Sequence, residues 1–288
     1  MRHKRRHGVS VEAPLPGCLF EIIDKTQIIF MVMRTENILG YRVAAVSPEA
    51  CMDALMKGID AATGGKLKPF WLACMNPHSA QMAMLDPAAE AALKAADFLV
   101  PDGAGIVLAS RILGGRIRER ITGSDVFRGV NEAMNRQGQG SCFFLGATED
   151  TLAAIRARMA VDFPNVRVAG TYSPPFKDEF TEEENRRMIE AVNAAKPDVL
   201  WVGMTAPKQE KWIYRNKEKL SVKFIGAVGG VFDFYSGNIR RNEYPWFMEH
   251  GLEWLPRLIQ EPGRLWKRTF ISAPVFFWHV LKQKFLSH

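Results

Sequence analysis

The chain has 288 residues, of which 47% are hydrophobic and 24% charged, and its formal net charge at neutral pH is +7. This length and hydrophobic content fit a folded α/β protein and exclude a chain that is disordered throughout. The positive charge favours an anionic partner, for which nucleic acid, an anionic membrane surface and a phosphorylated substrate are the alternatives.

The N-terminal region, residues 1–38, opens with the basic run MRHKRRHG and shows neither helical periodicity nor helix caps. We expect a basic, poorly ordered extension here, with Met31 and Met33 as alternative starts of the native protein. The apolar stretch after the basic run is interrupted by charged residues, at Glu21, Asp24 and Lys25. A signal peptide and a membrane-spanning helix both need an uninterrupted apolar core, so the sequence favours neither.

The four cysteines are far apart in the sequence and form no C-x-x-C pair: Cys18, Cys51, Cys74 and Cys142. This spacing predicts neither a zinc site nor a disulfide framework. The reducing cytoplasm is the simplest location for such a chain.

Residues 39–245 alternate apolar runs with amphipathic segments. This alternation predicts a Rossmann-like α/β domain, with a mainly parallel sheet and helices on both faces. The expected strands are YRVAAV, FWLACM, DFLVP, SCFFLG, VRVAGTY, DVLWVGM and KFIGAVG. Helix starts are marked by residues typical of caps and first turns: Ser47 before Pro48, Asp86 before Pro87, Thr148, and Thr181 with Glu184.

The first candidate site residues, Asn76 and His78, follow the apolar run FWLACM. In an open parallel sheet, ligands bind beyond the carboxyl ends of the strands, so we expect Asn76 to contact a ligand. An Asn-Pro pair is also typical of a simple turn, and a single His is more often structural than catalytic. The role of His78 therefore stays open.

The second candidate is Asp102, which follows the run DFLVP at the start of PDGAGIVLASRIL. A carboxylate at the end of a parallel strand faces the ligand crevice, which makes Asp102 the expected general base. Gly103 and Gly105 would let backbone N–H groups approach an anion. The alternative is that Asp102 only caps the helix that follows.

The third candidate is the loop RITGSDVF, which places a cation, two hydroxyls and a carboxylate close together. Arg120 can offer a phosphate two parallel hydrogen bonds. A helix cap by Thr122 or Ser124 explains one hydroxyl but not Arg120. We therefore expect Arg120, Thr122, Ser124 and Asp125 to bind substrate.

The fourth candidate is VGMTAPKQEKWI, where a helix is expected to begin near Pro207. Lys208 and Gln209 would lie in its first turn, and Gln209 can both donate to and accept from a phosphate or sugar oxygen. For Lys208 the alternative is simple solvation.

The last segment, residues 246–288, combines aromatic with basic residues. The aromatic residues expected at a membrane interface are Trp254, Trp266, Phe270, Phe276, Phe277 and Trp278, and the basic ones are Arg257, Arg264, Lys267, Arg268, Lys282 and Lys284. The run FISAPVFFWHVL is interrupted by Pro274 and is too short to cross a bilayer. We expect a helical appendage that lies on an anionic membrane surface. The alternative is that its aromatics pack on the catalytic domain or on another subunit.

Several common motifs are absent from the sequence: a G-x-x-x-x-G-K-[ST] loop, a G-x-G-x-x-G turn, a G-x-S-x-G elbow and an Asp-x-Asp pair for a divalent metal. Their absence weakens the kinase, dehydrogenase and hydrolase interpretations.

Five blocks, in this order between about residues 40 and 270, resemble the bacterial WecG/TagA/CpsF family of glycosyltransferases. They are PDGAGIVLASRILGGRIRERITGSDVF, FLGAT, PDVLWVGMTAPKQEKWI, GAVGGVFDFYSG and GLEWLPRLIQEPGRLWKR. The resemblance implies an inverting, metal-independent enzyme without a cofactor. Such an enzyme transfers a sugar from a UDP-sugar to a polyprenyl-diphosphate-linked sugar at the cytoplasmic face of the membrane, in the synthesis of cell-surface polysaccharide or teichoic acid.

The resemblance also assigns roles to residues of this chain. It places the base at Asp102 and substrate contacts at Asn76, Arg120, Thr122 and Gln209. It matches the family's C-terminal arginines to Arg257, Arg264 and Arg268. This sequence departs from the family's pattern at Pro77-His78 and at Thr205. The identity of the transferred sugar therefore stays open among N-acetylmannosamine, its uronic acid, glucose and galactose.

Two other functions remain as alternatives. The first is a non-catalytic protein that binds polyprenyl phosphate or a membrane surface with the same fold. Nucleic-acid binding ranks below it, because the basic residues form no known nucleic-acid recognition motif and cluster with aromatic residues typical of a membrane interface. Whether the chain forms a homo-oligomer stays open.

Overall fold

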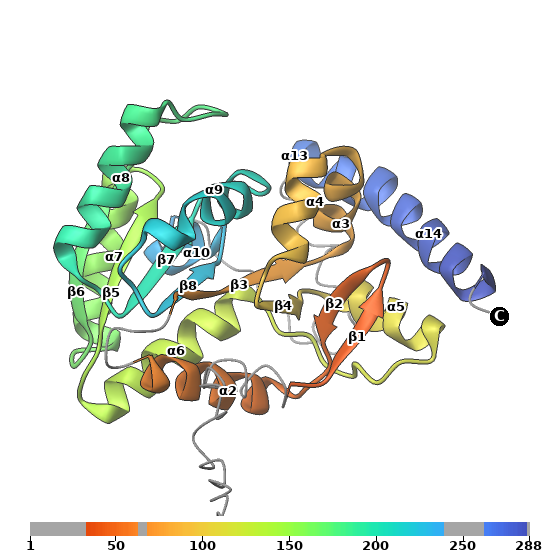
Figure 1. The fold of residues 1–288 in the computed structure, drawn as a ribbon, viewed down its shortest axis with the longest axis horizontal. Coiled ribbons are helices and arrows are strands. Elements are labelled where there is room, and N and C mark those ends of the chain that lie inside the picture. The colour runs from red at the N-terminus through yellow and green to blue at the C-terminus, as the bar shows by residue number, and fades with distance from the viewer. Residues whose placement is uncertain (1–32, 63–67, 239–261, 287–288) are drawn as a thin grey trace, which may run out of the picture.

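The computed structural model describes residues 33–62, 68–238 and 262–286. At its centre is a sheet of six parallel strands in the order β4-β3-β8-β7-β5-β6 (Figure 1). The strands are β3 (Phe70–Met75), β4 (Phe98–Pro101), β5 (Ser141–Gly146), β6 (Arg167–Tyr172), β7 (Val199–Gly203) and β8 (Phe224–Ala227). Each coincides with one of the expected apolar runs, which confirms the α/β class and the parallel sheet.

Two short strands, β1 (Thr35–Ile38) and β2 (Tyr41–Ala44), precede the sheet and pair with each other in antiparallel fashion. The expected strand YRVAAV therefore belongs to a hairpin and not to the parallel sheet. Leu39 and Gly40 make the turn with φ angles of 55° and 83°. Within the expected poorly ordered extension, Thr35–Ile38 is instead ordered, because β1 pairs with β2 and Ile38 is fully buried; residues 1–32 lie outside the described residues.

Helices cover both faces of the sheet. One face carries α3 (Pro77–Leu85), α4 (Pro87–Lys94), α5 (Ala104–Leu113), α8 (Glu182–Ala195) and α9 (Lys208–Asn216). The opposite face carries α2 (Pro48–Ala61), α6 (Gly123–Gln137), α7 (Glu149–Asp162) and α10 (Val231–Ser236). The expected N-caps Ser47, Asp86, Thr148 and Thr181 are all confirmed, each with its side chain accepting from a first-turn N–H.

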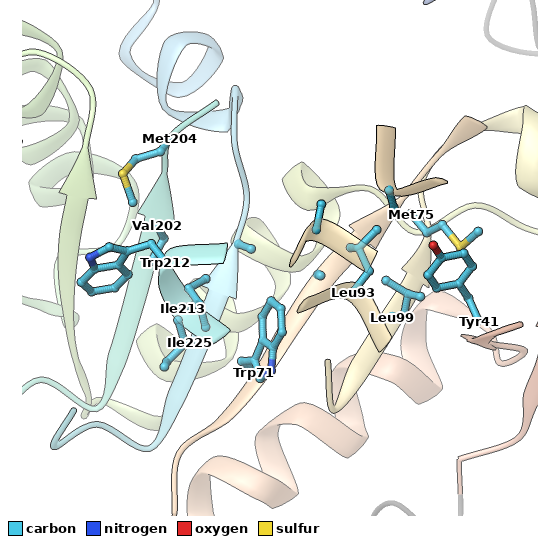
Figure 2. Packing of buried hydrophobic residues seen from close by; sticks show 14 of the residues in the cluster. Tyr41, Trp71, Met75, Leu93, Leu99, Val202, Met204, Trp212, Ile213 and Ile225 are labelled. Carbon is cyan, nitrogen blue, oxygen red and sulfur yellow. The ribbon is translucent and has the colours of Figure 1, made fainter. Parts of the chain in front are cut away.

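The strands supply both cores because successive side chains point to opposite faces. In β3, Trp71 and Met75 belong to the first core, whereas Phe70 and Leu72 belong to the second. Figure 2 shows the first core, where side chains of α9 lie close to those of β7 and β8.

The chain leaves the neighbouring strands β3 and β8 on opposite faces of the sheet. After β3 the chain continues into α3 on one face, and after β8 it continues into α10 on the other. Connections that leave in opposite directions open a crevice between two strands, and this is the usual ligand site of such sheets.

The described part of the C-terminal segment, residues 262–286, consists of α13 (Pro262–Lys267), a π-helical turn η2 (Arg268–Ser272) and α14 (Ala273–Leu286). In this segment, α14 packs on α3 and α5, and Phe276 and Val280 have no exposed surface. The expectation that Phe276 enters a membrane interface is therefore wrong, because this ring belongs to the first core. For Phe276, the alternative of packing on the catalytic domain is confirmed.

Other aromatic residues of the C-terminal segment face outward. Trp266, Phe270 and Trp278 are 56%, 50% and 69% exposed, while Phe277 is half-buried against the first core. Trp254 lies outside the described residues. In the part of the chain that the structure covers, no helix is both long enough and apolar enough to cross a membrane.

Candidate active site

Asn76 and Asp102 meet at the carboxyl ends of β3 and β4. The two strands are paired, with Met75 opposite Pro101, and the backbone N–H of Asp102 donates to the carbonyl oxygen of Met75 at 2.8 Å. The side-chain amide of Asn76 donates from Nδ2 to Oδ2 of Asp102 at 3.3 Å. Parallel pairing thus brings together two predicted site residues that lie 26 positions apart.

The orientation of the Asn76 amide is fixed by the first turn of α3. Its Oδ1 accepts from the backbone N–H groups of His78 and Ser79, at 3.1 and 2.9 Å, and the Ser79 hydroxyl accepts from the Asn76 N–H. Because Oδ1 is used by the helix, Nδ2 is the group left to face Asp102. Asn76 is therefore a helix cap that also holds a carboxylate.

Asp102 is not the N-cap of the helix that follows it. The N-cap of α5 is Gly103, and this helix has no side-chain cap. The N-cap position is therefore taken by Gly103, and Asp102 directly precedes it, so the alternative role of its carboxylate at the helix start is untested. Gly103 has a φ of 100°, which favours glycine, and a Cβ placed there would meet no atom within 4 Å apart from its chain neighbours.

Gly105 has a packing role. A Cβ at this position would clash with the ring of Pro77, so the missing side chain lets α5 approach the start of α3. This differs from the expectation that both glycines of the motif expose backbone to an anion.

The predicted loop around Arg120 lies beside the end of β4. The backbone N–H of Ile121 donates to the carbonyl oxygen of Pro101 at 2.8 Å, which places the loop that carries the half-buried Arg120 at the carboxyl end of β4, where Asp102 follows. The loop then leads directly into α6.

Thr122 and Asp125 form a capping box at the start of α6. Oδ2 of Asp125 accepts from the backbone N–H and the hydroxyl of Thr122, at 2.8 and 2.7 Å, and the Thr122 hydroxyl accepts from the Asp125 N–H. The cap interpretation is confirmed for Thr122, and it also accounts for Asp125. Ser124 is half-buried in the same turn. Contacts of these three residues with substrate remain a prediction.

The first residue of α6, Gly123, lies against the loop after β8. A Cβ there would come within 3.2 Å of the carbonyl oxygen of Val228. The absence of a side chain thus lets the start of α6 pack closely against the loop after β8.

Gln209 joins two loops at the carboxyl edge. Its Oε1 accepts from the backbone N–H groups of Met204 and Gly229, at 3.3 and 3.0 Å. Its Nε2 donates to Oε1 of Glu210 at 2.9 Å, and both side chains are buried. The amide is thus occupied by protein partners, and the predicted contact of Gln209 with substrate is untested.

Sequence reasoning missed Glu210 and the loop glycine Gly229. The carboxyl of Glu210 is buried, and among the described residues its Oε2 has no hydrogen-bond partner. Burial raises the pKa of Glu210, which favours the neutral acid. Helical spacing was the available signal: Trp212, Ile213 and Asn216 are also buried, so Gln209 and Glu210 fall on the inward side of α9.

Lys208 is held by the loop between β6 and α8. Its Nζ donates to the carbonyl oxygen of Lys177 at 2.8 Å and lies 5.5 and 5.4 Å from the ring centres of Phe176 and Phe180. Simple solvation does not describe this residue, which fastens the start of α9 to the loop between β6 and α8.

His78 connects this edge to the C-terminal segment. Its Nδ1 lies 2.8 Å from the hydroxyl oxygen of Ser272. Burial, together with the nearby cation of Arg268, lowers the pKa of His78 to about 4. Arg268, one of the predicted substrate contacts, therefore lies close to the start of α3.

Two further predicted arginines cannot be placed. Arg264 falls within α13, but its side chain lies outside what the structure describes, as does the whole of Arg257. Among residues 33–62, 68–238 and 262–286, no three His, Cys, Asp or Glu side chains gather in a way that would hold a metal ion.

The sequence model described as the glycosyl transferase WecG/TagA/CpsF family matches residues 36–288. The chain is 32% identical over 217 residues to an N-acetylglucosaminyldiphosphoundecaprenol N-acetyl-beta-D-mannosaminyltransferase of Bacillus spizizenii, covering 75% of this chain and 80% of the relative. It is 30% identical over 213 residues to the protein of the same name from Bacillus subtilis, covering 74% and 79%. For the protein of that name from Staphylococcus aureus strain MW2, identity is 27% over 211 residues, covering 73% and 78%.

Proposed function

Since the chain belongs to the WecG/TagA/CpsF family and is a glycosyltransferase, we propose that it transfers a sugar from a UDP-sugar donor to a polyprenyl-diphosphate-linked sugar. The relatives are named for transfer of N-acetylmannosamine to N-acetylglucosaminyldiphosphoundecaprenol. We therefore take UDP-N-acetylmannosamine and an N-acetylglucosaminyl diphospholipid as the first pair to test. The uronic acid, glucose and galactose donors follow.

The observation that carries the proposal is the position of the Asp102 carboxylate. At this edge of the sheet, Asn76 and Thr122 have side chains that cap a helix, whereas the Asp102 carboxylate accepts from the Asn76 amide and directly precedes the N-cap of α5. A carboxylate that accepts from a neutral amide at the carboxyl ends of the strands suits a general base.

In the proposed reaction, Asp102 takes the proton of the acceptor hydroxyl as its oxygen attacks the anomeric carbon from the face opposite the nucleotide. The new bond joins that oxygen to the anomeric carbon. The bond between the anomeric carbon and the diphosphate oxygen breaks, and its electron pair leaves with UDP. One displacement of this kind inverts the configuration.

The leaving diphosphate gains negative charge that needs cations. We assign this role to Arg120, beside the end of β4, and to the C-terminal arginines, with no metal ion. Arg268 supports the assignment because its charge acts on His78, which lies two residues beyond Asn76. Thr122, Ser124 and Asp125 complete the same loop and are proposed to face the sugar.

We place the enzyme at the inner face of the cell membrane, because its proposed acceptor is a lipid. The exposed apolar residues of the C-terminal segment support this placement: Trp266, Phe270, Ile271, Val275, Trp278, Leu281, Phe285 and Leu286. Lys267 and Lys282 are exposed among them. Aromatic and aliphatic side chains next to lysines suit the interface of an anionic bilayer.

The test is a panel of UDP-sugars with a short-chain diphospholipid N-acetylglucosamine acceptor, followed by UDP release and by the mass of the lipid product. We expect UDP and disaccharide lipid in equal amounts with one donor. Binding of the acceptor without UDP release from any donor would favour the alternative, a non-catalytic lipid-phosphate binding protein.

A further inference from the structure

His78 lies between the candidate base and the C-terminal segment. Its backbone N–H donates to Oδ1 of Asn76, whose Nδ2 holds Asp102. Its ring contacts Ser272, which is 194 residues away in the sequence and 2% exposed. A chain of contacts therefore runs from Ser272 through His78 and Asn76 to the carboxylate.

The direction of the hydrogen bonds in this series of contacts follows from which atoms can donate a proton. The Ser272 hydroxyl also lies 3.3 Å from Oε1 of Gln81, an atom that can only accept. A hydroxyl has one proton, so Ser272 donates to Gln81 and accepts from His78. The His78 ring therefore carries a proton on Nδ1, which faces Ser272.

The C-terminal segment has a second attachment far from the base. Oε1 of Gln283 accepts from the backbone N–H of Leu39 at 2.7 Å, and its Nε2 donates to the carbonyl oxygen of Asn37 at 3.1 Å. The two attachments hold opposite ends of α14: Ser272 directly precedes the helix, and Gln283 lies in its last turn. Substitutions can therefore loosen the segment at either end separately.

We propose that His78 is a positioning residue through which the docked C-terminal segment, by way of Ser272, fixes the Asn76 amide and hence the orientation of Asp102. This rests on the proposed function, because it takes Asp102 as the base. When Ser272 moves away, the ring loses its partner and the first turn of α3 is less constrained. The segment then controls the rate of transfer as well as the location of the enzyme.

Geometry at a reacting centre is demanding, since a displacement of about 1 Å can reduce a rate by roughly 100-fold. We expect Ser272→Ala and His78→Ala each to lower kcat by about 10- to 100-fold, with little change in KM for the donor. The double variant should be no slower than the slower single variant, because both substitutions break one chain of contacts. His78→Asn should keep most of kcat, because an Asn amide can place a donor near the position of Nδ1.

The matched control is Gln283→Ala, which removes the other attachment of the same segment. We expect this variant to lower Tm but to leave kcat unchanged. Wild-type kcat in Ser272→Ala would overturn the proposal. So would an equal loss of kcat in Gln283→Ala, because general loosening of the segment would then explain the effect.

Hydrogen exchange of the His78 and Ser79 amides separates this proposal from the proposed function. We expect Ser272→Ala to speed their exchange while Gln283→Ala does not. If the wild-type protein releases no UDP from any donor, the proposed function fails, and the exchange experiment still decides the coupling. Unchanged exchange in Ser272→Ala would contradict it.

Discussion

The side-chain amide of Asn76 donates a hydrogen bond to the carboxylate of Asp102, with 3.3 Å between Nδ2 and Oδ2. Asn76 reaches this carboxylate while its Oδ1 caps α3. One residue therefore serves both the stability of a helix and the geometry of the candidate base. Substitutions at position 76 can separate the two roles.

Asn76→Asp should keep the cap, since Asp is as good an N-cap as Asn, but it places a second carboxylate beside Asp102. We expect a Tm near that of the wild type and a large loss of kcat. Asn76→Ala should lose both roles, with a decrease of about 1 kcal/mol in the free energy of unfolding. Thermal unfolding and steady-state rates measure the two effects. Full activity in Asn76→Asp would show that the amide contributes nothing to the base.

Arg120→Lys should weaken binding of the UDP-sugar, because Lys keeps the charge but cannot make two parallel hydrogen bonds to a phosphate. We expect kcat/KM to fall by about 10-fold, in line with the loss of one charge-assisted bond. Arg128→Lys is the matched control, since Arg128 is exposed on α6 and pairs with Glu132. An equal decrease of kcat/KM in both variants would show that Arg120 does not bind the UDP-sugar.

Glu210→Gln should change how stability depends on pH. Burial raises the pKa of Glu210 in the folded protein above its value in the unfolded chain. Above about pH 4.3 the unfolded chain releases this proton while the folded protein keeps it, so in the wild type this group's contribution to stability falls as pH rises. Gln does not titrate. The variant should therefore gain stability relative to the wild type from pH 4 upward. Denaturant unfolding measures this, and a difference in the free energy of unfolding that does not change with pH would contradict it.

Replacing the exposed aromatic residues of the C-terminal segment should weaken membrane binding. We expect Phe270→Ser together with Trp278→Ser to abolish sedimentation with anionic vesicles, because both side chains are exposed and apolar. Val161→Ser, an exposed apolar position on α7, is the control and should still sediment. Deleting the segment is a poorer test, because Phe276 and Val280 are fully buried and their loss would destabilise the core. Continued binding of the double variant would exclude this surface.

The six parallel strands and most of the helix starts were predictable from the sequence, because apolar runs and capping residues act over a few neighbouring positions. β1 was missed, since TENI has no apolar alternation and is ordered by pairing with β2. The inward orientation of Gln209 was also missed, although the spacing of the buried residues in α9 indicates it.

The contacts between the site residues depend on the order of the strands. Asp102 and Asn76 touch because β3 and β4 are neighbours, and no local pattern records that pairing. The contact of His78 with Ser272 depends on where α14 docks. Motifs indicated which residues gather at the carboxyl edge, but long-range packing decides which of them meet.

The most direct test of the central claim is the rate of a single turnover in Asp102→Asn, measured together with its affinity for UDP. If Asp102 is the base, the rate should fall by about 10²- to 10⁴-fold, while UDP binds as tightly as it does to the wild type. A near-normal rate would contradict the account and assign proton removal to another group.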